Sequence, residues 1–356
     1  MKMGMSSLNH YLQYLILRLT DDCNLRCRYC YASGGRNKTT MPWPVAKKAL
    51  DLAGASGLPF SVQLTGGEPL LAWDLAQEAI TYCRSVGYHA FFKLQTNGTL
   101  ISSRVARELR RLNIGVGISL DGPPNANEYL RPRADGGRST QATITGMQNL
   151  AEEQVMVGVT AVITSKNIHH LHWLLDLSLY AGNIGGITFD ILRKQGRAVA
   201  DYDDLYPQSE DVREGLKKVV DHAAFLKSLG VKVPKLRHLE HIRYFKATDL
   251  PRSSYCYATT GKSLAITPDG SAYPCASLAE EKVFYLGNIM DPHFSPFRAY
   301  QAHPILKNNP RPAPCSTCGH SSFCGGGCLA RNYAISPDLN QPDPAFCAMI
   351  STLSRF

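Results

Sequence analysis

The residues of this chain best suited to chemistry are its cysteines. Cys23, Cys27 and Cys30 stand in a CxxxCxxC spacing directly after a strand-like run. A structural zinc site uses four protein ligands, so three close thiolates leave one coordination position open. Such thiolates are also the usual ligands of iron–sulfur clusters, and a four-iron cluster on three cysteines keeps one iron free for a small molecule. A catalytic zinc site and unligated cysteines stay open as alternatives.

A second group of seven cysteines follows residue 255: Cys256, Cys275, Cys315, Cys318, Cys324, Cys328 and Cys347. Four of them fall within fourteen residues, beside the glycine run 325–327. This spacing alone is a strong metal signal, and four cysteines would satisfy a zinc-ribbon-like structural site. Seven cysteines exceed one zinc site, however, and nearly suit two iron–sulfur clusters.

A glycine-rich motif closes the second strand-like run. Residues 65–69 read Thr-Gly-Gly-Glu-Pro. Gly66 and Gly67 let the backbone approach a ligand closely, and Glu68 offers a carboxylate. Without its context the same segment would be an ordinary turn.

Other potential ligands are interpreted as structural. Cys83 shares a helical face with Ala76 and Ile80, which predicts a buried packing role. Helix capping and solvated faces account for the histidines His169, His170, His172, His238 and His241.

The elements that position these motifs alternate between two patterns. Short branched or aromatic runs predict strands at 14–20, 60–65, 91–96, 116–120, 157–163 and 187–192. Helical patterns lie near 44–55, 73–86, 104–112, 143–153, 171–180 and 210–229. This alternation predicts an α/β fold with a parallel sheet. Six repeats are two short of a closed barrel, so we expect a partial (β/α)6 TIM-like barrel with ligands at the carboxyl ends of its strands.

The texture changes in the last third of the chain. Beyond Pro251 the sequence is broken into short segments by Pro, Gly and Cys, and such a region is expected to fold around metal. We therefore predict a barrel domain over 1–230, a linker over 231–250 and a cluster domain over 251–356.

Composition excludes several classes of protein. The 356 residues carry a net charge of +9 and are 44% hydrophobic and 19% charged, as in an ordinary globular protein. No apolar run reaches the length of a membrane span, and the opening residues lack a signal-peptide apolar block. We therefore expect a cytoplasmic protein without a membrane partner. The positive charge is scattered rather than blocked, so nucleic-acid binding is not expected, whereas acidic partners are.

The first 230 residues or so resemble the radical SAM superfamily. The resemblance rests on the CxxxCxxC loop with an aromatic residue, Tyr29, before its last cysteine, and on the Gly-Gly-Glu-Pro segment. It implies a [4Fe-4S] cluster on Cys23, Cys27 and Cys30 whose open iron binds S-adenosylmethionine (SAM). An electron from the cluster would then release a 5′-deoxyadenosyl radical that takes hydrogen from a substrate. Contacts to SAM are implied for Gly66, Gly67, Glu68, Tyr29, Asn97, Ser119 and Arg131.

The C-terminal cysteines resemble the SPASM extension of that superfamily, which holds two auxiliary [4Fe-4S] clusters. The resemblance implies one cluster on Cys315, Cys318, Cys324 and Cys347, and another on Cys256, Cys275 and Cys328. The second set has only three thiolates, because residues 257–263 lack the cysteine that some relatives supply. Its fourth ligand stays open.

Members of this group mostly modify peptides or proteins, by crosslinking, epimerisation or oxidation, and this is the function that the resemblance implies. The alternatives are cofactor biosynthesis on a tetrapyrrole or quinone, sulfatase maturation, and a noncatalytic iron–sulfur electron carrier or zinc scaffold. Sulfatase maturation is disfavoured because Ala276 stands where those relatives place an Asp after the cysteine. The catalytic acid or base is unknown from sequence.

The expected partners follow from the same resemblance. A low-potential electron donor, flavodoxin or ferredoxin, would reduce the cluster. About thirteen residues precede the first strand-like run, so we expect no leader-recognition domain there, and a leader-bearing substrate would need a separate recognition protein.

Overall fold

The computed structural model describes residues 11–248, 250–279 and 281–356, so the opening segment that lacks a signal-peptide block lies outside it up to residue 10. The chain divides into two compact units. The first comprises Met1–Cys23, Ala32–Gln95 and Ser254–Pro310, and the second comprises Asn24–Tyr31, Thr96–Ser253 and Arg311–Phe356. Both units therefore combine segments that are distant in sequence.

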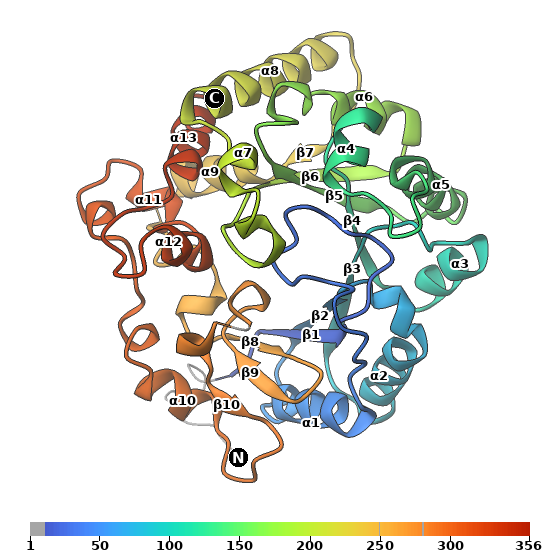
Figure 1. The fold of residues 1–356 in the computed structure, drawn as a ribbon, viewed down its shortest axis with the longest axis vertical. Helices are drawn as coiled ribbons and strands as arrows, with labels where there is room; N and C mark the ends of the chain where they lie inside the picture. The colour runs from blue at the N-terminus through green and yellow to red at the C-terminus, as the bar shows by residue number, and fades with distance from the viewer. Residues whose placement is uncertain (1–10, 249, 280) are drawn as a thin grey trace. The chain divides into compact units, whose positions relative to one another are not determined.

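The first unit is built on a parallel sheet (Figure 1). Its N-terminal elements are β1 (Tyr14–Thr20), α1 (Trp43–Gly54), β2 (Phe60–Gly66), α2 (Trp73–Ser85) and β3 (Ala90–Thr96). Its C-terminal elements are β8 (Ser263–Ile266), β9 (Ser271–Tyr273), β10 (Gly287–Asn288) and α10 (Pro296–Ala302). β8 pairs in parallel with β1, and β9 and β10 follow antiparallel, giving the order β10-β9-β8-β1-β2-β3. A strand from the cysteine-rich region thus extends the N-terminal sheet.

Both faces of β1 are covered. Leu15, Leu17 and Leu19 on one face have no exposed surface, and Ile16, Arg18 and Thr20 on the other face are also buried, as expected for a strand of a parallel sheet. The covering face of α2 is built from small and branched side chains and includes Cys83, which is 1% exposed. The prediction that Cys83 serves packing is confirmed.

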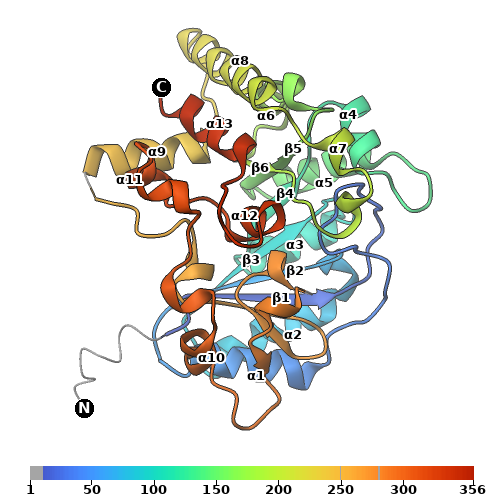
Figure 2. The same ribbon diagram turned by 60° about the vertical axis from the view of Figure 1, so that its left-hand side comes forward.

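The second unit continues the same alternation (Figures 1 and 2). Its barrel elements are α3 (Ser103–Arg111), β4 (Gly115–Ser119), α4 (Pro124–Leu130), α5 (Ser139–Glu152), β5 (Val157–Ile163), α6 (Trp173–Ala181), β6 (Ile184–Ile191), α7 (Tyr202–Leu205), α8 (Ser209–Ser228), β7 (Lys235–Leu236) and α9 (Arg237–Thr248). Its C-terminal helices are α11 (Ser321–Cys324), α12 (Leu329–Ile335) and α13 (Pro344–Leu353). β4, β5, β6 and β7 pair in parallel in that order, and α13 lies against α8.

Short 3-10 helices complete the connections: Pro69–Ala72, Ile168–His170, Gly196–Val199, Tyr257–Thr259, Ala276–Leu278, Lys282–Phe284, Leu306–Asn308 and Ala313–Ser316. Among the described residues, no helix is both long and apolar enough to cross a membrane.

The α/β prediction is confirmed, and each predicted strand is present within a few residues of its expected ends. Several helices were not expected. α4, α7 and the C-terminal helices α10 to α13 lie in segments for which no helix was predicted, and α9 with β7 occupies the segment 231–250 that was predicted to be a linker. In α9 only Leu239 and Ile242 are fully buried and His238 is partly buried, so its charged sequence carries a weak apolar pattern.

One face of β4, β5 and β6 is unusually small and polar. In the strand register Gly117, Gly158 and Gly186 lie side by side, and the next row holds Ser119, Thr160 and Thr188. Closed barrels fill this interior with bulky branched residues. The small rows therefore fit an open, partial barrel.

Candidate active site

The cysteine loop that follows β1 is fixed through its backbone. Within the second unit, the Arg26 N–H donates to the Pro132 carbonyl at 2.7 Å, and the Arg28 N–H donates to the Leu130 carbonyl at 2.9 Å. An antiparallel bridge between Leu25 and Arg133 lies beside the first of these bonds, so the loop is tied to the segment that follows α4. The side chain of Cys27 is buried between these anchors.

A second support for the loop comes from the 3-10 helix after β6, and sequence reasoning missed it. The Arg197 Nε donates to the Cys27 carbonyl at 2.8 Å, and its backbone N–H donates to the Cys30 carbonyl at 3.0 Å. A Cβ atom added to Gly196 would lie 2.3 Å from the Cys30 carbonyl oxygen. A glycine followed by a basic residue at the carboxyl end of a strand was the only signal in the sequence.

The Cys27 thiol lies in a charged environment. Burial raises its pKa to about 11, and Arg131 and Arg197 act in the opposite direction. Because a metal binds the thiolate, loading this site must release a proton. The two guanidinium groups favour the negative charge that ligation requires.

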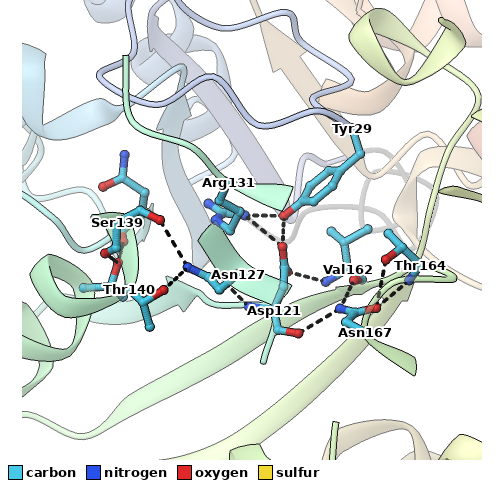
Figure 3. A network of polar contacts seen from close by, with 11 residues as sticks. Tyr29, Asp121, Asn127, Arg131, Ser139, Thr140, Val162, Thr164 and Asn167 are labelled. Carbon is cyan, nitrogen blue, oxygen red and sulfur yellow. Dashed lines mark hydrogen bonds and ion pairs between the residues drawn. The ribbon is translucent and has the colours of Figure 1, made fainter. Parts of the chain in front are cut away.

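Tyr29 and Arg131 meet in a buried network whose centre is Asp121 (Figure 3). The Tyr29 hydroxyl donates to Asp121 Oδ2 and accepts from Arg131 Nη1 at 2.5 Å. Arg131 Nη1 also lies 3.9 Å from Asp121 Oδ2. Burial holds the pKa of Tyr29 well above its usual value, so the phenol stays a hydrogen-bond donor.

Asp121 is itself held on every side (Figure 3). Its Oδ1 accepts from the Val162 N–H at 2.8 Å, and its backbone N–H donates to Asn127 Oδ1 at 3.0 Å. Its carbonyl accepts from Asn167 Nδ2 at 2.8 Å. Burial raises the pKa of Asp121, although Arg131 and the bond from Tyr29 lower it. Asp121 follows the fourth predicted strand but was not among the contacts predicted from the sequence.

Arg131 keeps two donors for a ligand. Among the described residues its Nε and Nη2 atoms make no hydrogen bond, whereas Nη1 is held by Tyr29. Its side chain is 10% exposed. A guanidinium fork fixed in this way suits a carboxylate, so the residue fits the predicted contact with the carboxylate of SAM.

The Gly-Gly-Glu segment packs against the backbone that leads into Cys23. Gly66 adopts a φ of 150°, and a Cβ atom there would lie 2.3 Å from the Thr20 carbonyl oxygen. The Gly67 N–H donates to that same carbonyl at 2.7 Å, and the Glu68 N–H donates to the Asp22 carbonyl at 2.8 Å. The glycines thus allow two backbones to meet, and Glu68 is fully buried and caps the following 3-10 helix through the Leu70 N–H.

Two predicted SAM contacts lie elsewhere in the second unit. Asn97 is buried, and its Nδ2 donates to Asn24 Oδ1 in the cysteine loop at 2.8 Å. Ser119 is the last residue of β4 and is half-buried. Asn97 therefore supports the loop directly, and Ser119 lies two residues before Asp121.

The C-terminal cysteines form groups within each unit. Burial and the nearby thiols of Cys324, Cys315 and Cys318 raise the pKa of Cys347 to about 12, so these four cysteines lie in one group. In the first unit, burial raises the pKa of the Tyr300 hydroxyl well above its usual value, and the nearby thiols of Cys275 and Cys256 raise it further. Cys328 is buried at the start of α12.

Among the described residues, no three Cys, His, Asp or Glu side chains lie close enough to hold a single metal ion. The thiolates of an iron–sulfur cluster bind separate irons, so they need not converge on one point. The donor set is therefore chemically suited to clusters.

Comparison with known proteins places the chain in a family. Residues 17–177 match the model of the radical SAM superfamily, and residues 256–319 match that of the SPASM iron–sulfur cluster-binding domain. An uncharacterized protein of Methanocaldococcus jannaschii is 33% identical over 282 residues, which cover 79% of this chain and 90% of that protein. The chain belongs to the radical SAM superfamily.

Relatives of named function match most of the chain. The mycofactocin maturase MftC of Mycolicibacterium smegmatis is 29% identical over 338 residues, covering 93% of this chain and 81% of the maturase. Among solved structures, native anSMEcpe with bound AdoMet has a TM-score of 0.80 at 20% identity and covers 97% of this chain and 96% of its own. The likeness to anSMEcpe establishes the partial-barrel fold with its C-terminal extension.

Proposed function

We propose that this chain cleaves SAM to a 5′-deoxyadenosyl radical and uses it to modify a peptide or protein. The observation that carries the SAM chemistry is the Arg131 guanidinium, fixed by Tyr29 and Asp121 beside the Cys27 loop with two donors available for a carboxylate. The peptide substrate is supported by the similarity to a mycofactocin maturase over 93% of the chain.

Each predicted residue receives a role in this proposal. Cys23, Cys27 and Cys30 hold the [4Fe-4S] cluster, which when bound supplies the electron that breaks a carbon–sulfur bond of SAM. Arg131 orients the SAM carboxylate, and Tyr29 and Asp121 keep that guanidinium in place. The other proposed contacts to SAM come from Gly66, Gly67, Glu68, Asn97 and Ser119.

We assign the auxiliary ligands as the resemblance implies. Cys315, Cys318, Cys324 and Cys347 form one set. This is consistent with the neighbouring thiols that raise the pKa values of Cys315 and Cys347. Cys256, Cys275 and Cys328 form the other. Both sets would accept an electron from the substrate or anchor it.

The residue after Cys275 argues against sulfatase maturation. Ala276 begins a 3-10 helix there, and its methyl group can neither accept nor donate a proton. An acid–base role at this position is therefore excluded for this chain.

The proposed partners are a precursor peptide, a separate leader-recognition protein and a flavodoxin or ferredoxin. The structure of Streptococcus suis SuiB was solved with its precursor peptide SuiA, and SuiB shares the fold with a TM-score of 0.64 at 17% identity, covering 90% of this chain and 72% of SuiB. A tetrapyrrole is the second candidate substrate. It is favoured by 30% identity to the Fe-coproporphyrin III synthase of Methanosarcina barkeri over 179 residues, which cover 48% of this chain and 43% of that enzyme.

Anaerobic reconstitution tests the proposal. Iron and sulfide are counted, and 5′-deoxyadenosine is followed after adding SAM and dithionite. About twelve irons and deoxyadenosine release are expected, because each proposed cluster is a four-iron unit. Cys27→Ala should abolish SAM cleavage, whereas Cys318→Ala should retain cleavage that is uncoupled from substrate modification. Cys83→Ser is the matched control, and it should change neither the iron content nor the release of 5′-deoxyadenosine.

The substrate is tested by mass spectrometry on candidate precursor peptides and on an iron-containing tetrapyrrole. Crosslinking removes two hydrogens, whereas epimerisation in deuterated water replaces one hydrogen of the peptide by one deuterium. Cleavage retained in Cys27→Ala, or zinc in place of iron, would contradict the proposal. A product from the tetrapyrrole alone would move the assignment to cofactor biosynthesis.

A further inference from the structure

Arg331 on α12 is among the largest fully buried side chains of the described residues, with 1% of its side chain exposed. Burying an arginine without partners is very costly, so its environment must supply negative charge. It lies three residues after Cys328 in the sequence.

One partner of Arg331 comes from the barrel. Its Nη1 pairs with Oδ1 of Asp190, near the carboxyl end of β6. The other carboxylate oxygen of Asp190 pairs with Arg193 Nη2 at 2.6 Å. The Arg193 guanidinium in turn lies 5.7 Å from the ring centre of Tyr31, which directly follows Cys30. Arg331 is thereby connected to the end of the first cysteine loop.

The second partner comes from the C-terminal segment. Arg331 Nε lies 3.5 Å from Oδ2 of Asp343, the residue that caps α13 through the Phe346 N–H. Its guanidinium also lies 4.5 Å from the ring centre of Phe346. Phe346 is followed directly by Cys347. Asp343 additionally accepts from the Tyr206 hydroxyl at 2.6 Å.

The neighbouring residue reinforces the same arrangement. Asn332 is buried, and its Nδ2 donates to the Gly326 carbonyl in the turn before Cys328 at 2.9 Å. Its Oδ1 accepts from the Asp343 N–H at 3.1 Å. One short helix thus links the glycine turn, the cap of α13 and strand β6.

We propose that Arg331 is a positioning residue that holds Cys328 and Cys347 relative to β6 by pairing Asp190 with Asp343. The carboxylates offset its charge on two sides, and removal of Arg331 leaves the buried carboxylate of Asp343 without its cationic partner, whereas Asp190 keeps its pair with Arg193. The proposal rests on the proposed function only where it treats these cysteines as cluster ligands. Its consequence is that SAM cleavage and substrate modification depend differently on Arg331.

Hydrogen exchange of the anaerobic, reconstituted protein tests the inference without relying on activity. Arg331→Met keeps most of the side-chain volume and removes the charge. Amides of 329–353 should exchange roughly 100-fold faster, because breaking one member of a buried pair shifts the local opening equilibrium by about that factor. Asp190→Asn should act in the same direction. The α2 amides around Cys83, in the other unit, should not change.

Arg107→Met is the matched control. Arg107 on α3 pairs with Glu153 at 3.5 Å, and its side chain is 70% exposed, so its loss should leave exchange at 329–353 unchanged. Iron content and deoxyadenosine release complete the comparison. In Arg331→Met, iron should fall by about four to eight per chain, while SAM cleavage persists and modified product is lost.

Unchanged exchange and iron in Arg331→Met would overturn the proposal. If that variant does not fold, Arg331→Lys replaces it, since lysine keeps the charge but not the two-sided fork. Faster exchange confined to 329–353 then supports the proposal, and exchange equal to wild type overturns it. If the wild-type chain binds no iron but Arg331→Met still exchanges faster than wild type at 329–353, the ligand assignment is refuted and the role of Arg331 stands.

Discussion

Gly67→Ala should separate the backbone of the glycine motif from the cysteine loop. A Cβ atom at this position would lie 2.1 Å from the Asp22 carbonyl oxygen and 2.8 Å from the Asp21 carbonyl oxygen. Both contacts are with backbone atoms, so no side chain can rotate away. The segment before Cys23 must move by about 1 Å to reach ordinary contact.

The cost follows from what that movement breaks. Two hydrogen bonds join the segments, from Gly67 N–H to the Thr20 carbonyl at 2.7 Å and from Glu68 N–H to the Asp22 carbonyl at 2.8 Å. Each contributes about 1 kcal/mol, and overpacking adds about 1–3 kcal/mol. We therefore expect the free energy of unfolding to fall by about 3–5 kcal/mol.

Urea unfolding measures the stability, and iron counting with deoxyadenosine release measures the site. Gly185→Ala is the control, because a Cβ atom on that glycine of β6 would meet its nearest neighbour at 3.5 Å. Gly67→Ala should lose about four irons and all SAM cleavage, since Cys23 directly follows the displaced segment. A Gly67→Ala protein with wild-type stability and a full complement of iron would refute the reasoning.

Two further predictions concern buried polar groups. Asp121→Asn removes the charge that holds Arg131 and should lower the free energy of unfolding by about 2–3 kcal/mol and weaken SAM binding by about tenfold, measured by urea unfolding and calorimetry. Unaltered SAM affinity would show that Asp121 does not position the guanidinium. Burial, with help from Arg331, lowers the pKa of His238 to about 4, below its usual value of 6.5, so folding favours the neutral ring. The contribution of His238 to the free energy of unfolding is therefore complete above pH 6.5 and is lost as the pH falls towards 4. Between pH 7 and pH 5 the loss is about 2 kcal/mol. When unfolding is measured at pH 7 and pH 5, His238→Gln should not show this loss of stability. An equal loss in the variant would contradict the assignment of the pH dependence to His238.

The sequence by itself determined the family and the succession of the six barrel strands, and it predicted the cysteine sets. The strands were predictable because alternation and branched residues act locally, and the CxxxCxxC and Gly-Gly-Glu-Pro motifs are short and contiguous. Helix α9 was not predictable in the same way, because only Leu239 and Ile242 of its charged sequence are buried.

The tertiary structure alone decided how the site is supported. Asp121 joins Tyr29 and Arg131 across about a hundred residues, and Arg197 reaches the Cys27 carbonyl from 170 residues away. β8 pairs with β1 although the two lie at opposite ends of the chain. No local pattern in the sequence predicts such contacts, because a buried charge needs a partner but the sequence does not specify where that partner lies. The residues proposed for the chemistry can therefore be predicted from short motifs, whereas the groups that hold those residues in place can be identified only in the folded structure.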